Sequence, residues 1–148
     1  MKTNEELSWI TTYQTIEALS LEMDKIMLVE HPSLVPFFLS GKPIENKNSE
    51  YNQAVALADA RIGAIDAILT YASFRHADEK IVGWKNTFSS YLRNSPLMCE
   101  RLKVNSGYYG LVNPLGKAAC GGGPDDYKSP IGNLIRDPIR CLTLQAQC

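Results

Sequence analysis

The segment from Tyr51 to His76 constrains the fold most strongly, because it is the longest stretch of unbroken helical periodicity in the chain. Along it, apolar residues and one terminal histidine recur at alternating spacings of three and four: Val55, Ala58, Ile62, Ile65, Leu69, Ala72 and His76. That spacing places them on one face of a helix. Asp59, Arg61 and Asp66 fall outside the stripe, so we expect them on a solvated face. The segment therefore predicts a long amphipathic helix over residues 50–76.

Small residues on this helix predict a close helix neighbour. Glycine in a helix interior costs about 1 kcal/mol relative to alanine, so Gly63 needs a structural reason. It lies among Ala60, Ala64 and Ala67, and together the four residues form what we call the Ala/Gly face. We expect either a tight helix crossing at Gly63 or self-association of the chain through this face.

Three further segments carry helical patterns, which together predict an all-α bundle. Residues 4–30 have Thr3 or Asn4 as a helix cap and an apolar stripe formed by Trp9, Tyr13, Ile16, Leu19, Met23, Ile26 and Met27. Residues 79–94 carry a stripe formed by Ile81, Trp84, Phe88 and Tyr91. A short fourth helix over 96–104 begins with Ser95 as its cap and Pro96 at the first helical position.

Punctuation between these segments predicts the domain organisation. His31-Pro32 should end the first helix, and the polar stretch 42–50 reads as a linker. Residues 1–109 are expected to form the helical bundle domain. From Gly110 onward glycine, proline and asparagine are frequent, which predicts an irregular extension over 110–148 that buries little. Short helices capped at Ser129 and Asp137 would fit its last apolar patch.

Charge and hydropathy argue against nucleic-acid binding, a membrane span and secretion. The chain has 148 residues with 15 basic and 16 acidic side chains, so no basic surplus indicates nucleic acid. The most apolar stretch, 55–72, contains three charged residues, so we expect no membrane span. Glu5 and Glu6 stand where a signal peptide would have its apolar core. We therefore expect a cytoplasmic protein.

The four cysteines give a weak signal. Cys99, Cys120, Cys141 and Cys148 are separated by 21, 21 and 7 residues, and no C-x-x-C pair occurs. Structural zinc sites usually draw their ligands from close pairs, so we expect no metal. A disulfide in the tail would form only if the chain met an oxidant.

Several helix-punctuating motifs occur in an order that resembles a known group of proteins. The motifs are His31-Pro32, Phe37-Phe38, Trp84, Phe88, Tyr91, Ser95-Pro96, Leu102 and Tyr108-Tyr109. Together they resemble small bacterial helical proteins of unknown function over residues 27–109. The resemblance implies a helical fold and a bacterial source but no activity. Some members of the group have membrane helices before this region, where this chain has an amphipathic helix, and they lack the tail after Gly110.

No catalytic motif accompanies these helices. The chain contains neither H-E-x-x-H nor G-x-S-x-G nor a phosphate-binding loop. His31 is expected at a helix end and His76 at the edge of an apolar stripe, both structural positions. Asp59 and Asp66 are expected to be surface charges rather than an acid–base pair, so Asp59→Ala should have little effect.

Three hypotheses about function remain open. The leading one is a non-catalytic interaction or regulatory module that binds a protein partner or itself, without a cofactor. The second is a small-ligand or cofactor-binding bundle. Its pocket would be lined by Phe37, Phe38, Trp84 and Tyr108, with His31 as the polar contact. The third is an enzyme that uses His31 or His76.

Overall fold

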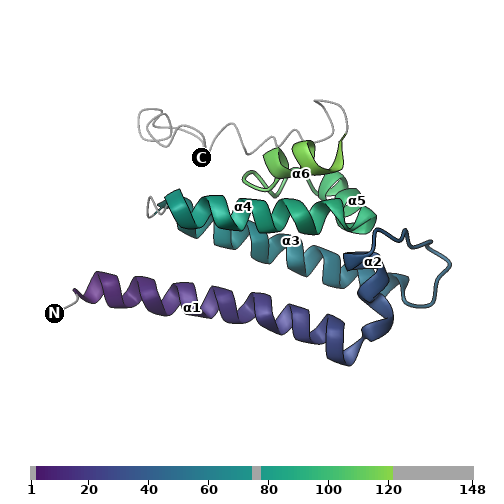
Figure 1. Cartoon of the computed structure of the whole chain (residues 1–148), viewed down its shortest axis with the longest axis horizontal. Helices are drawn as coiled ribbons and strands as arrows, with labels where there is room; N and C mark the ends of the chain where they lie inside the picture. Colours follow the sequence, from purple (N-terminus) through teal and green to yellow (C-terminus); the bar gives the residue numbers. More distant parts are fainter. Residues whose placement is uncertain (1–2, 75–77, 122–148) are drawn as a thin grey trace, which may run out of the picture.

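A computed structural model of the chain describes residues 3–74 and 78–121 (Figure 1). Its elements are α1 (Asn4–Lys25), a π-helical turn (Ile26–Glu30), a 3-10 turn (Pro32–Leu34), α2 (Val35–Leu39), α3 (Tyr51–Phe74), α4 (Asp78–Arg93), α5 (Pro96–Val104) and α6 (Asn113–Cys120). Within the described residues there is no strand, so the predicted all-α class is confirmed. His76, Ser129 and Asp137 lie outside the described residues.

Helix α3 is the centre of the bundle. It contacts α1 on one side and α4 and α5 on the other, while α6 lies on α4 and α5 (Figure 1). Five residues of the predicted stripe are buried, Ala58, Ile62, Ile65, Leu69 and Ala72, and Val55 packs half-buried against the same core. A second buried line runs beside it, formed by Ala54, Leu57, Arg61, Ala64 and Ile68. The expectation that Arg61 is solvated was therefore wrong, because α3 is covered on two sides and not on one.

Helix α1 lies along one edge of the molecule and is only partly covered. It begins with the capping box that Thr3 forms with Glu6, which confirms one of the two predicted caps. Its inner line is half-buried to buried and consists of Trp9, Tyr13, Ile16, Ser20, Met23 and Met27. Leu19 was predicted on this line, yet it is 47% exposed. One residue corresponds to about 100° of helix rotation, so Ser20 takes the inward position instead.

Two local predictions, one about a helix end and one about a helix crossing, have different outcomes. His31-Pro32 does end the first helix, after a π-helical turn that His31 closes by donating its N–H to the Ile26 carbonyl. The predicted tight crossing at Gly63 was wrong, because a Cβ built there meets no heavy atom within 4 Å. A side chain at this position would point into open space, so the packing of neighbouring helices does not require glycine here.

The short helix α2 closes one end of the bundle. Phe37 and Phe38 are buried there, as expected for residues that fold over the end, whereas Leu39 is exposed. Ser95, the confirmed cap of α5, accepts a bond from the Met98 N–H at 3.2 Å. Its hydroxyl also donates to the Phe37 carbonyl at 2.8 Å, so a single buried serine fixes α5 against α2.

Helix α6 forms where the composition predicts a loop. Val112, Asn113 and Gly116 are buried, so the expectation that this stretch buries little was wrong for residues 112–116. Pro114 suits the first turn of a helix, because its missing N–H would have no helical partner there. A disulfide between Cys99 in α5 and Cys120 holds the other end of α6. The predicted domain boundary at residue 110 stays a prediction.

Candidate functional site

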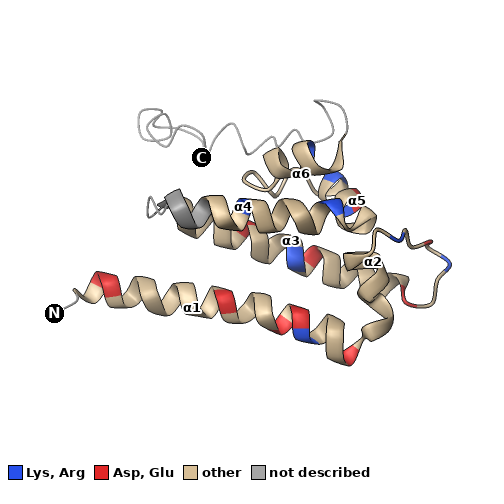
Figure 2. Ribbon diagram, viewed as in Figure 1, with Lys and Arg blue, Asp and Glu red and all other residues tan. Residues whose placement is uncertain are grey.

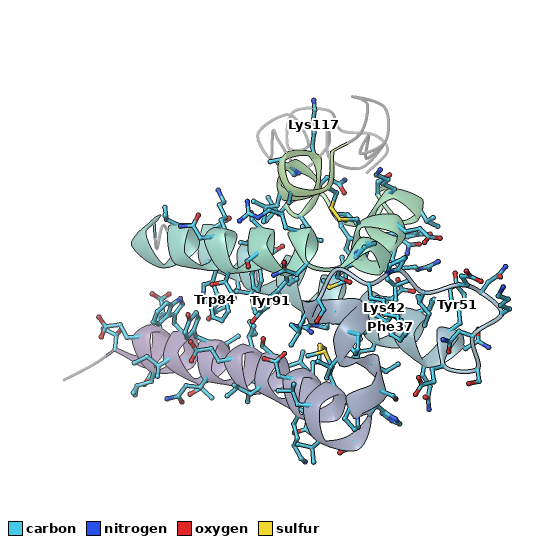
Figure 3. The ribbon with its side chains drawn as sticks, turned by 45° about the vertical axis from the view of Figure 1, so that its right-hand side comes forward. Phe37, Lys42, Tyr51, Trp84, Tyr91 and Lys117 are labelled. Carbon is cyan, nitrogen blue, oxygen red and sulfur yellow. A yellow bond between two sulfur atoms is a disulfide. The ribbon has the colours of Figure 1, made fainter. Side chains whose placement is uncertain are left out.

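The residues predicted to line a ligand pocket lie at separate places. His31 is half-buried after the π-helical turn, and Phe37 and Phe38 are buried in α2. Trp84 lies toward the other end of the molecule, and Figure 3 shows it well away from Phe37. Tyr108 is 78% exposed between α5 and α6. The ligand-binding hypothesis stays a prediction, and these positions give it no shared cavity.

Trp84 has a structural partner in α1. Its indole N–H donates to the Tyr13 hydroxyl at 2.7 Å, across the interface between α4 and α1. Tyr13 stacks on Trp9 with ring centroids 5.5 Å apart, and Trp84 stacks on Phe88 at 5.1 Å. The hydrogen bond joins these two stacked pairs and so connects α1 to α4. Trp84 and Tyr91 both point toward α1 in Figure 3.

Arg61 is the one charged side chain among the buried residues of the described chain. Its guanidinium lies 3.1 Å from the Asp24 carboxylate of α1 and donates to the Met27 sulfur at 3.3 Å. The same group lies 5.6 Å from the Phe38 ring centroid and 4.7 Å from that of Tyr91. Burial lowers the pKa of Arg61, and the nearby Asp24 carboxylate opposes that shift. No local sequence pattern predicts this centre, because the anionic partner of Arg61 comes from another helix, 37 residues earlier in the chain.

A small cavity adjoins Arg61. Ser20, Met23, Ile65 and Tyr91 contribute to its lining, and its volume is about 10 Å³. That volume suits about one water molecule and is far below the roughly 300 Å³ or more of a small-molecule site. Because the guanidinium is already occupied by a carboxylate and two rings, this centre joins α1, α3 and α4 and offers no ligand site.

A second polar cluster joins α3 to α5. The Arg101 guanidinium donates two bonds to the Asp59 carboxylate, each 2.9 Å long, and the Asn105 amide adds one at 3.3 Å. This hydrogen bonding raises the pKa of Arg101. The interpretation of Asp59 as a free surface charge was therefore wrong. A bidentate pair of this geometry gives Asp59→Ala a measurable cost.

Asp66 has a similar role about two helix turns further along α3. Its half-buried carboxylate accepts a bond from the Leu111 N–H at 3.3 Å, just before α6 begins. Burial raises the pKa of Asp66, and the bonds from the Leu111 and Val112 N–H groups partly offset that shift. Burial also raises the pKa of Tyr109, with Asp59 and Asp66 adding to the effect. Both acids hold the C-terminal helices on α3, and Asp66 was not the free surface charge expected.

The outer face of α1 is the least expected surface. Six positions in α1 and one in the π-helical turn after it are exposed at alternating spacings of four and three, and we call them the outer seam: Leu7, Thr11, Gln14, Ala18, Leu21, Lys25 and Leu28. Leu21 is 69% exposed, and Leu7 and Leu28 are each about half exposed. Leucines at multiples of seven residues were the signal available in the sequence. It was missed because the aromatic stripe on the opposite side already accounted for a helix.

Acidic side chains flank the outer seam. Residues 4–30 contain Glu5, Glu6, Glu17, Glu22, Asp24 and Glu30 but only one basic residue, Lys25. Residues 82–121 have the opposite balance, with Lys85, Arg93, Arg101, Lys103 and Lys117 against Glu100. Figure 2 shows this division, with red concentrated on α1 and blue on α4 to α6, and Lys117 points outward in Figure 3. The net charge is therefore near zero only because an acidic segment, residues 4–30, and a basic segment, residues 82–121, offset each other.

Metal-ligand clusters and membrane-spanning helices are absent from the described residues. Among the described residues no group of three or more His, Cys, Asp and Glu side chains is placed to hold a metal ion. No helix in the described ranges combines the length and apolar character needed to cross a membrane. Comparisons of the chain with protein-family models, curated proteins and solved structures find no match.

Proposed function

We propose that this chain is a non-catalytic interaction module that binds a helix of another protein along the outer seam of α1. The observation that carries the proposal is the exposure of Leu7 and Leu21 on the outer face of α1, with Leu28 exposed in the π-helical turn that follows, while the opposite face of α1 is already packed. Apolar residues at a heptad spacing are the pattern by which two helices pack along their lengths. Helix α1 carries apolar residues on two sides, and the described helices cover only the inner one, so the outer side is available to a partner.

The polar members of the outer seam are compatible with a helix partner. The Thr11 hydroxyl donates to the Leu7 carbonyl at 2.9 Å, so covering Thr11 leaves no unpaired hydroxyl. Gln14 and Lys25 interrupt the leucines. In helix pairs such polar residues lower the affinity but fix the register and the partner.

The disulfide bears on the compartment in which the module acts. The predicted cytoplasmic location stays a prediction, and the Cys99–Cys120 bond is the observation that weighs against it. Disulfides persist in oxidising compartments and are rare in a reducing cytosol. Self-association through the Ala/Gly face also stays a prediction. Ala60 and Ala67 on that face are exposed, but Ala64 is buried inside the bundle.

The proposal is tested by selecting helical peptides from a displayed library against the immobilised full chain. We expect the recovered peptides to carry apolar heptads and to lose at least about tenfold in affinity toward Leu21→Asp. Tyr108→Asp is the matched control, because it changes an equally exposed apolar residue on another surface. Peptides that bind both variants as well as the wild type would show that the outer seam is not the docking surface.

A further inference from the structure

The charges beside the outer seam carry information about which helix can occupy it. In heptad notation Leu7, Gln14 and Leu21 are d positions, and Thr11, Ala18 and Lys25 are a positions. The flanking e and g positions then include Glu17, Glu22 and Asp24. These are the positions whose charges choose the partner and orientation in packed helix pairs.

A second copy of the chain is disfavoured at this seam. In a parallel pair, Glu17 of one copy would face Glu22 of the other, since g positions oppose e positions of the next heptad. In an antiparallel pair g positions oppose g positions, so a pair centred on Glu17 would place two copies of Glu17 against each other. Like charges across a helix interface oppose pairing, which is how sequences reject wrong partners.

Partners within the chain neutralise part of the flanking negative charge. Asp24 is partnered by the buried Arg61, with 3.1 Å between nitrogen and oxygen. Glu22 lies 3.5 Å from Lys25, but both side chains are more than half exposed, so water screens that pair. Glu17 is half-buried, and its side chain is hydrogen-bonded to the Tyr13 side chain. The negative charge that remains beside the leucines therefore comes from Glu17 and Glu22, with Lys25 in the seam itself.

We propose that the occupant of the outer seam is a cationic amphipathic helix of another protein, with apolar residues at a and d and Lys or Arg at e and g. The α1 helix of 22 residues spans about 33 Å, which matches a partner of about three heptads. This inference rests on the proposed docking function and adds the chemical identity of the partner to it.

Two synthetic peptides of about three heptads separate charge from shape. Both have Leu at d and Ala at a, and one has Lys at e and g where the other has Glu. We expect the Lys peptide to bind the full chain at least about tenfold more tightly than the Glu peptide in calorimetry. We also expect this preference to shrink as salt screens the flanking charges.

Charge reversal on the protein makes the test specific to the seam. Glu17→Lys with Glu22→Lys should reverse the preference, so that the Glu peptide binds more tightly. The control pair, Glu45→Lys with Glu100→Lys, changes the net charge equally at exposed positions outside α1. It should leave the preference for the Lys peptide unchanged. An equal loss of preference in the control pair would overturn the inference by showing attraction to net charge alone.

The other outcomes distinguish the two proposals. Tighter binding of the Glu peptide to the wild type would overturn the cationic partner and leave the docking function standing. If neither peptide binds but sedimentation shows a dimer that Leu21→Asp dissociates, the occupant is a second copy and the inference fails. If neither peptide binds and the chain is a monomer, both the inference and the docking function fail.

Discussion

Helices α1 and α3 have nearly the same length, 22 and 24 residues, but very different environments. Buried residues recur along α3, whereas Met23 is the one buried residue within α1. Both helices are apolar on more than one face. In α3 neighbouring helices cover both of the apolar faces, and in α1 only the inner one is covered. The comparison shows that, among residues 3–74 and 78–121, the apolar faces of the helices exceed what the neighbouring helices cover.

The largest expected effect is a direct test of this comparison. Ile65 is buried in α3 and Leu21 is exposed on α1, and both can be replaced by aspartate. Ile65→Asp buries an unpaired charge, so we expect it to lower the free energy of unfolding by about 4 kcal/mol or more. Leu21→Asp should change it by no more than about 0.5 kcal/mol. Urea titration followed by circular dichroism measures both.

The pair of variants also has outcomes that would break the comparison. An Ile65→Asp protein with wild-type stability would mean that the central stripe is not the core. Equal losses in both variants would mean that the outer seam is packed within the chain, which would remove the basis for docking there.

Much of the fold could be predicted from the sequence, because local physics determines it. Helical periodicity placed the helices, and the caps Thr3 and Ser95 are local hydrogen-bond motifs that side chains and nearby N–H groups form on their own. His31-Pro32 ends a helix through proline sterics, which also act between neighbours. These features need no knowledge of the rest of the chain.

The polar centres could not be predicted, because their partners are far apart in sequence. Arg61 is buried only because Asp24 and two aromatic rings from other elements surround it. Asp66 is half-buried because Leu111 donates to it. The helix α6 likewise contradicts its loop-like composition, since contacts with α4 and a disulfide override a weak local preference. A sequence pattern shows where polar residues occur, but it does not show which charged side chains pair with each other in the fold.

The Arg61 centre ties the two compared helices together, so its removal should have the next largest effect. Arg61→Ala leaves the Asp24 carboxylate partly buried without its partner and removes two ring contacts. We expect a loss of about 3 kcal/mol in the free energy of unfolding. Lys25→Ala removes an exposed ion pair with Glu22 on α1, the helix that carries Asp24, and should cost less than about 0.5 kcal/mol. Similar values for both in urea titration would show that Arg61 does not join α1 to α3.

The disulfide extends the comparison to α6, which is fastened covalently where α1 is not. Cys99 and Cys120 are 21 residues apart, so opening the bond frees a loop of moderate length in the unfolded chain. Cys99→Ser with Cys120→Ser should lower the free energy of unfolding by up to about 3 kcal/mol. Hydrogen exchange should rise in α6 more than in α1. Unchanged exchange in α6 would mean that Asp66 and packing hold it without the bond.

The smallest expected effect is a pH dependence at Asp66. Burial raises its folded-state pKa above the ordinary 3.8, so above that pH the folded state binds more protons than the unfolded state. The contribution of Asp66 to the free energy of unfolding should therefore fall as the pH rises from about 3.8 through the raised folded pKa. Asp66→Asn has no such titration and keeps an oxygen that can accept from the Leu111 N–H.

The difference between wild type and Asp66→Asn isolates this titration from those of the other carboxylates. Urea midpoints measured across acidic pH should show the wild type losing stability relative to the variant as the pH rises. A difference that instead grows in favour of the wild type would mean that the N–H bonds at the start of α6 outweigh burial. In that case Asp66 would be an anchor of α6 in its charged form, comparable to Asp59 on Arg101.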